Sequence, residues 1–410
     1  MICRAEQLAI IMVSSKCQTI VIPFEYYDQV ENYLRTEQID IINKELFDFP
    51  GSEEFFSWMK ENSESLRLKM NHSHHIITPK NSYAAPMQLN LELTTRCPLH
   101  CPQCYCNLNR GKDLSLDRAK DVLRQAAELG VAYINLSGGE TMVYPHLYEL
   151  LRECSSLGMY AAVALSGYGI DKDSLNKLID NGAHEIYVSL NGSTEEISSI
   201  TRDGYHLAIN ALELLSEIGF ENTAVNWVAH QSNIEDFANV AMLCARLHVK
   251  KLIVMVFKPD ASHSLESAPD GEQLLKLVQD IKQLRSTLPS LCIEVESCYS
   301  PLRALLGQKF LLNSNVGISK GCGAGREGAS LDVDGNFTPC RHLDFPEYFD
   351  SLKDYWYKSE LLQKLRFVET TPEEPCANCR YSPYCLSCLA VNAKLHNRIV
   401  KANKYCSLWK

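Results

Sequence analysis

Residues 84–290 repeat a strand-then-helix pattern, and this repeat limits the possible folds more than any other feature of the sequence. Apolar strand candidates lie at 88–93, 133–136, 160–165, 185–190, 224–228 and 252–257, and amphipathic segments of helical spacing separate them. Gly130, Gly158, Gly182 and Gly219 fall where helix C-caps are expected, because glycine adopts the left-handed conformation without steric cost. Repeated β–α units predict an α/β protein with a parallel sheet, either doubly wound or a partial barrel. Six units fit an incomplete (β/α)6 barrel better than a complete eight-stranded one.

Two regions of different character flank this repeat. Residues 1–83 contain apolar runs at 8–13 and 19–24 that predict a β-hairpin, then two amphipathic stretches at 26–36 and 53–62. A polar, proline-containing linker follows at 71–83. Residues 291–410 are rich in cysteine and poor in regular pattern, apart from a hairpin predicted around the Asp334-Gly335 turn. The sequence therefore predicts three domains, namely a small α+β domain at 1–83, a partial barrel at 84–290 and a cysteine-rich domain at 291–410.

The chain contains seventeen cysteines, a high and odd number for 410 residues. A secreted disulfide scaffold would be much shorter and would follow an export signal, which the first residues do not resemble. Clustered cysteines in a reducing compartment indicate metal ligation instead. The net charge of −10 argues against binding to nucleic acid or anionic lipid. No apolar run approaches the roughly 20 residues that span a bilayer. We expect a cytoplasmic protein without nucleic-acid or membrane partners.

Three of the cysteines form a compact loop directly after the first predicted strand of the repeat. Cys97, Cys101 and Cys104 have the spacing C-x3-C-x2-C. Three thiolates can hold three corners of a 4Fe–4S cluster and leave the fourth iron open to another ligand. A zinc knuckle or a set of buried structural thiols is the alternative. The position at the carboxyl end of a strand favours the cluster, because function collects at that edge in parallel α/β folds.

A second set of cysteines occupies the C-terminal region. Cys322 and Cys340 flank Gly335 in the spacing C-x12-G-x4-C. The remaining members follow the spacing C-x2-C-x5-C-x2-C and end in a separate cysteine, and they are Cys376, Cys379, Cys385, Cys388 and Cys406. Two zinc sites with four thiolates each are also compatible with this spacing.

The first loop resembles the signature of the radical S-adenosylmethionine (SAM) superfamily, whose fold is a partial (β/α)6 barrel. The resemblance implies that the amino and carboxylate groups of SAM chelate the open iron. It also implies that an electron, delivered by a reductant such as flavodoxin or ferredoxin, cleaves SAM to methionine and a 5′-deoxyadenosyl radical. That radical abstracts a hydrogen atom from the substrate.

Polar residues at the ends of the following strands match the SAM pocket of this superfamily. Gly138, Gly139 and Glu140 resemble its GGE motif, in which the backbone approaches the ligand closely and the carboxylate pairs with the amino group of SAM. Alone, the motif could be an ordinary helix-start turn. The resemblance further implies SAM contacts from residues at later strand ends and the loop after them, namely Ser166, Ser189, Asn191 and Arg202.

The C-terminal array resembles the SPASM domain, which carries two auxiliary 4Fe–4S clusters, so that the chain would hold three clusters in all. The resemblance assigns Cys322, Cys340 and Cys388 to the cluster nearer SAM. It assigns Cys376, Cys379, Cys385 and Cys406 to the distal one. The family has three residues between its last paired cysteines, where this chain has two between Cys385 and Cys388. Spacing favours an open iron in the nearer cluster over ligation by Cys298.

Proteins that combine these two domains mostly modify peptides or protein side chains. We therefore expect a maturase that forms a thioether or another crosslink within a ribosomally made precursor peptide, with residues 1–83 as a candidate domain for recognising its leader. Oxidation or dehydrogenation of a protein side chain, as in sulfatase maturation, or of a small molecule is the alternative. Sulfatase-maturing relatives place an aspartate base where this chain has Arg341, followed by His342. A non-enzymatic metal or electron carrier is a third interpretation. No catalytic side chain is assigned from the sequence.

Overall fold

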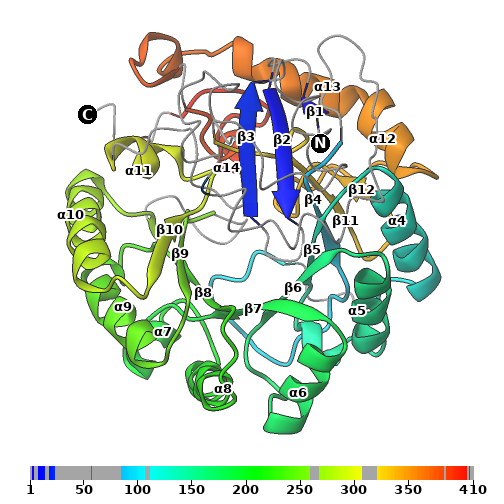
Figure 1. Ribbon diagram of the computed structural model, residues 1–410. Helices are drawn as coiled ribbons and strands as arrows, with labels where there is room; N and C mark the ends of the chain where they lie inside the picture. The colour runs from blue at the N-terminus through cyan, green and yellow to red at the C-terminus, as the bar shows by residue number, and fades with distance from the viewer. Residues whose placement is uncertain are drawn as a thin grey trace.

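The computed structural model describes residues 85–106, 111–258, 267–306, 321–382, 385–403 and 406, together with strands 2–3, 8–13 and 18–23 and residue 57. Its centre is a nine-stranded sheet that curves into an open barrel (Figure 1). Along the sheet the strands run β10 (Cys292–Val295), β9 (Lys251–Met255), β8 (Thr223–Val228), β7 (Ala183–Ser189), β6 (Tyr160–Leu165), β5 (Tyr133–Ser137), β4 (Gln88–Glu92), β11 (Gly328–Leu331) and β12 (Phe337–Thr338). Strands β4 to β10 and β11 pair in parallel, and β12 returns antiparallel to β11.

Helices cover the outer side of this barrel (Figure 1). They are α4 (Leu116–Glu128), α5 (Leu147–Ser156), α6 (Lys172–Asp180), α7 (Glu195–Ser199), α8 (Tyr205–Glu217), α9 (Phe237–Arg246) and α10 (Gly271–Thr287). Two short 3₁₀ helices, η7 (Thr141–Val143) and η8 (Ile234–Asp236), precede α5 and α9. Helix α4 shows the common design, because Ala119, Val122, Leu123 and Ala126 lie on one face and are buried against the sheet. None of the helices described here is long and apolar enough to cross a membrane.

The six predicted β–α units are confirmed, with boundaries that shift by only a few residues. The four glycines expected at helix C-caps all have positive φ, between 69° and 105°. The prediction did not include β10, because four residues at the start of the cysteine-rich region carry little periodic signal. The sheet therefore extends past residue 290, and β11 adds a further strand beside β4.

The N-terminal segment forms a small separate sheet. Strands β1 (Ile2–Cys3), β2 (Leu8–Val13) and β3 (Gln18–Pro23) pair antiparallel in that order. The hairpin predicted from the two apolar runs is thereby confirmed. The amphipathic stretches predicted at 26–36 and 53–62 and the linker at 71–83 lie outside the described residues, apart from residue 57.

The C-terminal region has more regular structure than its sequence indicates. It contains α11 (Ser300–Leu305), α12 (Leu352–Lys358), α13 (Glu360–Phe367) and α14 (Leu389–His396), besides the predicted β11–β12 hairpin. The sequence pattern did not predict these four helices. Each helix has only six to eight residues, so tertiary packing stabilises it more than its own propensity does. Tyr355 and Trp356 of α12, for example, are fully buried.

Candidate active site

A cavity of about 390 Å³ lies inside the open barrel, at the carboxyl ends of the parallel strands. Residues from or just after β4 to β10 line one part of its wall, and the segment from Cys322 to His342 lines another. The cavity brings together most of the residues predicted from the sequence: Cys97, Cys101, Cys104, Gly138, Gly139, Ser166, Ser189, Asn191, Arg202, Cys322, Cys340 and Cys388. The strand–helix repeat explains this convergence, because every parallel strand ends at the same edge of the sheet.

The three-cysteine loop is fixed where it leaves β4. The guanidinium of Arg96 donates hydrogen bonds to both carboxylate oxygens of Asp113, at 3.0 and 2.7 Å, and to the carbonyl of Val143 at 2.8 Å. Within the loop, the backbone N–H of Cys104 donates to the carbonyl of Cys101 at 3.1 Å. These hydrogen bonds within the protein fix the conformation of the cysteine loop.

The thiols of this loop differ in their surroundings. Burial raises the pKa of Cys97. A hydrogen bond from the neighbouring Cys106 thiol lowers the pKa of Cys104 to about 7. Cys106 also lines the cavity, and the sequence analysis did not assign it to the site.

Gly138 and Gly139 are required by the close packing of the cysteine loop. The N–H of Gly139 donates to the carbonyl of Thr94 at 2.6 Å, and the N–H of Glu140 donates to the carbonyl of Arg96 at 2.9 Å. A Cβ atom on Gly139 would lie 2.4 Å from the Arg96 carbonyl oxygen, and one on Gly138 would lie 2.7 Å from that of Thr94. The sequence suggested that the glycines admit a ligand, whereas the structure shows that they admit the loop that carries Cys97.

Glu140 is 1% exposed and is held at both carboxylate oxygens. Its Oε2 accepts hydrogen bonds from the backbone N–H of Ser166, at 2.9 Å, and from the Ser166 hydroxyl. Its Oε1 accepts from the N–H of Met142 at 3.0 Å and so caps η7. Burial raises the pKa of Glu140. Ser166 lines the cavity and Glu140 does not, so the hydrogen bonds to Ser166 connect the Glu140 carboxylate to the site.

Asn191 and Arg202 connect the ends of β7 and β8 with the loop after α7. The amide of Asn191 donates to the Thr201 hydroxyl at 2.9 Å and accepts from the N–H of Val228 at 3.2 Å. Nε of Arg202 donates to the carbonyl of Ser189 at 3.1 Å. Both polar atoms of the Asn191 amide are hydrogen bonded within the protein, so this side chain holds the surrounding loops in place.

A second group of thiols lines the opposite part of the cavity and includes Cys298 beside Cys322, Cys340 and Cys388. The Cys298 thiol is hydrogen bonded to Cys388, which lowers the pKa of Cys388 to about 7. Burial raises the pKa of Cys322 to about 11 and that of Cys340 still higher. Spacing in the sequence favoured an open iron over Cys298. The signal that could have found Cys298 is its place soon after β10, at the functional edge of the sheet.

The other four predicted ligands, Cys376, Cys379, Cys385 and Cys406, do not line the cavity. They lie near one another, and burial, with the charges of Cys406 and Cys376, raises the pKa of Cys385 to about 12. Among the described residues, no three Cys, His, Asp or Glu side chains converge on a point that would hold a single metal ion. A 4Fe–4S cluster takes each thiolate at a different iron, so its ligands surround a volume instead.

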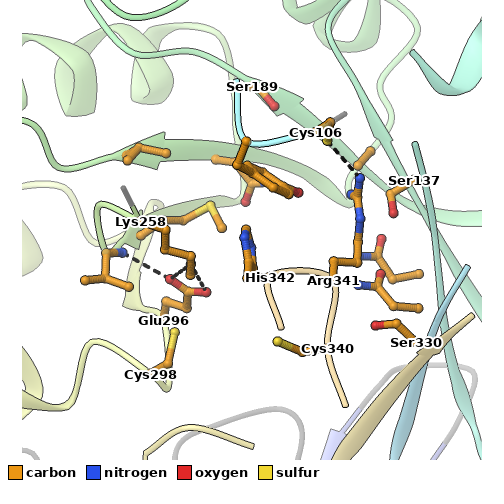
Figure 2. Close-up of a pocket in the computed structure, with 18 of the residues that line it drawn as sticks. Cys106, Ser137, Ser189, Lys258, Glu296, Cys298, Ser330, Cys340, Arg341 and His342 are labelled. Carbon is orange, nitrogen blue, oxygen red and sulfur yellow. Dashed lines mark hydrogen bonds and ion pairs between the residues drawn. The ribbon is translucent and has the colours of Figure 1, made fainter. Parts of the chain in front are cut away.

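Charged and aromatic side chains also line this cavity, and Figure 2 shows Lys258, Glu296, Arg341 and His342 among them. Nζ of Lys258 lies 2.8 and 2.9 Å from the two carboxylate oxygens of Glu296. The His342 ring lies 4.0 Å from that of Tyr105, measured between centroids. Burial, with the charges of Lys258 and Arg341 nearby, lowers the pKa of His342 well below its usual value, which keeps the ring neutral. The sequence analysis did not assign Lys258 or Glu296 to the site, since neither belongs to a motif.

Part of the chain matches a known family model, and curated proteins are similar to most of it. Residues 91–244 match the model of the radical SAM superfamily. The chain is 27% identical over 321 residues to a PqqA peptide cyclase of Ruegeria pomeroyi, covering 73% of this chain and 81% of that protein. It is 29% identical over 312 residues to the PqqA peptide cyclase of Rhizobium meliloti, covering 72% and 79%.

Solved structures have the same fold. The chain aligns with Streptococcus suis SuiB bound to S-adenosylmethionine with a TM-score of 0.66 and 18% identity, over 93% of this chain and 88% of SuiB. It aligns with anSMEcpe bound to AdoMet and the Cp18Cys peptide with a TM-score of 0.61 and 16% identity, over 79% and 94%.

Proposed function

From its radical SAM domain, residues 91–244, we propose that this chain is an enzyme that crosslinks a ribosomally made precursor peptide. The observation that carries the proposal is one cavity lined by the Cys97–Cys104 loop, by Gly138 and Gly139, and by a second thiol group that includes Cys298 and Cys388. The similarity to proteins named PqqA peptide cyclase supports a peptide as substrate. The fold is one in which both SAM-bound and peptide-bound structures are known.

Radical SAM domains use a 4Fe–4S cluster and SAM, and the residues of this cavity fit both groups. Cys97, Cys101 and Cys104 offer three thiolates on one preshaped loop, which leaves one iron for SAM. When bound, the cluster and SAM supply a 5′-deoxyadenosyl radical that abstracts a hydrogen atom from the substrate.

The residues of the SAM pocket would bind SAM and orient it. Glu140, held by Ser166, would accept the amino group, and the guanidinium of Arg202 would take the carboxylate. Ser189 and Asn191 would order the ribose side of the pocket, and Gly138 and Gly139 would keep the cysteine loop close to it.

Eight further thiols, in two groups of four, would hold two auxiliary 4Fe–4S clusters. Because Cys298 is hydrogen bonded to Cys388 and lines the same cavity as Cys322 and Cys340, we assign all four thiols to the nearer cluster. The proposal thus departs from the open iron that spacing favoured. Cys376, Cys379, Cys385 and Cys406 would hold the distal cluster.

Further parts of the proposal concern partners and domains. Residues 1–83, which begin with the β1–β3 sheet, would recognise the leader of the precursor by strand addition. Residues 84–290 would form the catalytic barrel and 291–410 the SPASM domain. Flavodoxin or ferredoxin in the cytoplasm would deliver the electron. Sulfatase-type oxidation is less well supported, because Arg341 stands where that class places a carboxylate base.

The decisive experiment measures 5′-deoxyadenosine made by the anaerobically reconstituted protein with SAM and a strong reductant. The control is the triple variant Cys97→Ala, Cys101→Ala, Cys104→Ala. Wild type should form 5′-deoxyadenosine and the variant should not, after which candidate precursor peptides are screened for a change in mass. If a fully iron-loaded wild type makes none, the enzyme proposal fails and a metal or electron carrier becomes the better interpretation.

A further inference from the structure

Arg341 lines the cavity and projects from the loop after Cys340 toward Cys106 (Figure 2). Its Nη2 donates to the Gly138 carbonyl at 3.1 Å and to the Cys106 sulfur at 3.3 Å. Its guanidinium carbon lies 5.4 Å from the centre of the Tyr105 ring. These contacts hold the guanidinium in one orientation, with its side chain only 10% exposed.

Despite this burial, one donor of the Arg341 guanidinium has no partner among the described residues. Its Nη2 forms an ion pair with Oε1 of Glu92 at 3.6 Å, a separation longer than a direct hydrogen bond. Its Nε–H is buried and has no acceptor among the described residues. An unpaired buried donor of a charged group costs more than an ordinary unmade hydrogen bond. Such a group in a binding cavity indicates an acceptor that arrives with the ligand.

The charges of the described cavity wall favour an anionic acceptor. Its cationic side chains are Arg202, Lys258 and Arg341, whereas its only carboxylate is Glu296. Both oxygens of Glu296 already contact Lys258. Arginine and lysine side chains therefore outnumber carboxylates in this lining, although the whole chain carries −10. Arg202 faces the strand ends proposed for SAM, which leaves Arg341 for the substrate.

Neighbouring strands supply unpaired acceptors to the same cavity. Asn90 on β4 and Asn135 on β5 are opposite one another in the sheet, and the Oδ1 atom of each is buried without a partner. Ser330 on β11 lies opposite Asn90 on the other side. Amide oxygens of this kind accept N–H groups, which a peptide backbone offers at every residue except proline.

We propose that Arg341 binds the carboxylate of an aspartate or glutamate side chain in the substrate peptide, while Asn90 and Asn135 accept hydrogen bonds from its backbone. This specificity determinant rests on the proposed function and deepens it by naming an acidic peptide segment as substrate. A guanidinium matches a carboxylate with paired N–H donors, which an uncharged amide cannot reproduce.

The test compares two capped pentapeptides, N-acetyl-Ala-Ala-Glu-Ala-Ala-amide and its glutamine counterpart, bound to the reconstituted, SAM-loaded holoenzyme under anaerobic conditions. Wild type should bind the acidic peptide about 10-fold more tightly or better. Arg341→Gln should reduce the ratio of the two affinities to within about 2-fold, and Arg341→Lys should retain an intermediate ratio. Arg124→Gln, which removes an exposed arginine on α4, should leave the ratio unchanged.

The ratio separates this inference from its competitors. If wild type binds both peptides equally, or neither detectably, Arg341 does not select a carboxylate. If Arg341→Gln keeps the ratio but weakens SAM binding or lowers iron content, Arg341 serves SAM or a cluster, and the inference is overturned. Failure of the proposed function is recognised separately, as absence of 5′-deoxyadenosine from the wild type.

Discussion

The carboxylate of Glu140 accepts a hydrogen bond from the backbone N–H of Ser166 at 2.9 Å, and this contact joins the ends of β5 and β6. Through its other oxygen, Glu140 also caps η7 at Met142. One buried side chain thus links two strand ends and orients a negative charge beside the cysteine loop. The SAM pocket proposed here depends on that arrangement.

Replacing Glu140 with glutamine should weaken SAM binding by about 10-fold or more, because the amide keeps the shape but loses the charge that pairs with the amino group. SAM affinity of the reconstituted protein measures the effect. Glu128→Gln, an exposed change on α4, is the matched control and should leave the affinity unchanged. Equal affinity in the Glu140 and Glu128 variants would remove Glu140 from the SAM pocket.

The same residue predicts a pH dependence. Burial raises the pKa of Glu140, so its carboxylate is protonated at a higher pH than an exposed glutamate. SAM affinity should therefore fall as the pH is lowered from 7 toward about 5, because the charged form binds the amino group. For folding the sign is opposite, since a raised carboxyl pKa favours the folded state at low pH. A Glu140→Gln variant that keeps the same pH profile would contradict this assignment.

Gly139→Ala should lower the iron content of the reconstituted protein toward that of the triple cysteine variant. The new Cβ atom would meet the Arg96 carbonyl at 2.4 Å, so the loop that carries Cys97 must move. Iron per chain and the absorbance of the cluster report the change. Gly219→Ala is the control and should keep full iron, because its new Cβ atom meets nothing within 4 Å although φ is 70° there. If both variants retain full iron, the close packing of Gly139 does not govern the loop.

Cys298→Ala should remove the iron of the nearer auxiliary cluster and alter its paramagnetic resonance spectrum, because the thiol lies against Cys388. Cys292→Ala, an exposed cysteine of β10 outside both thiol groups, is the control and should bind iron like wild type. Full iron and an unchanged spectrum in Cys298→Ala would restore the open-iron interpretation.

Arg118 ties helix α4 to the C-terminal region. It donates hydrogen bonds to the carbonyls of Phe349, Asp350 and Gly335, at 2.7, 3.0 and 3.2 Å. Arg118→Gln should lower the free energy of unfolding by about 2 kcal/mol, because charged donors are lost and partly buried carbonyls lose their partners. Chemical unfolding of the metal-free protein measures this loss. Arg124→Gln on the same helix removes only an exposed ion pair and should change it by less than about 0.5 kcal/mol. Similar losses in both variants would mean that the Arg118 contacts contribute little.

Local pattern in the sequence was sufficient for the barrel units and for much of the candidate site. The alternation of apolar strands with amphipathic helices predicted β4 to β9, and glycine chemistry predicted the helix ends. The spacing of Cys97, Cys101 and Cys104, together with their place after a strand, predicted a thiol loop on the functional edge. Each of these features depends on residues a few positions apart, so the local sequence is enough to predict it.

Only the tertiary structure showed which residues from distant segments of the chain come into contact. The Cys298 thiol is hydrogen bonded to Cys388, 90 positions later in the sequence. Strand β11 pairs with β4, and Arg341 donates to the Gly138 carbonyl after the end of β5. No local periodicity encodes such contacts, because they arise only when the C-terminal region packs over the open side of the barrel. The sequence by itself determined the barrel and its cysteine loop, and the packing of the chain determined which thiols, charges and amides share one cavity.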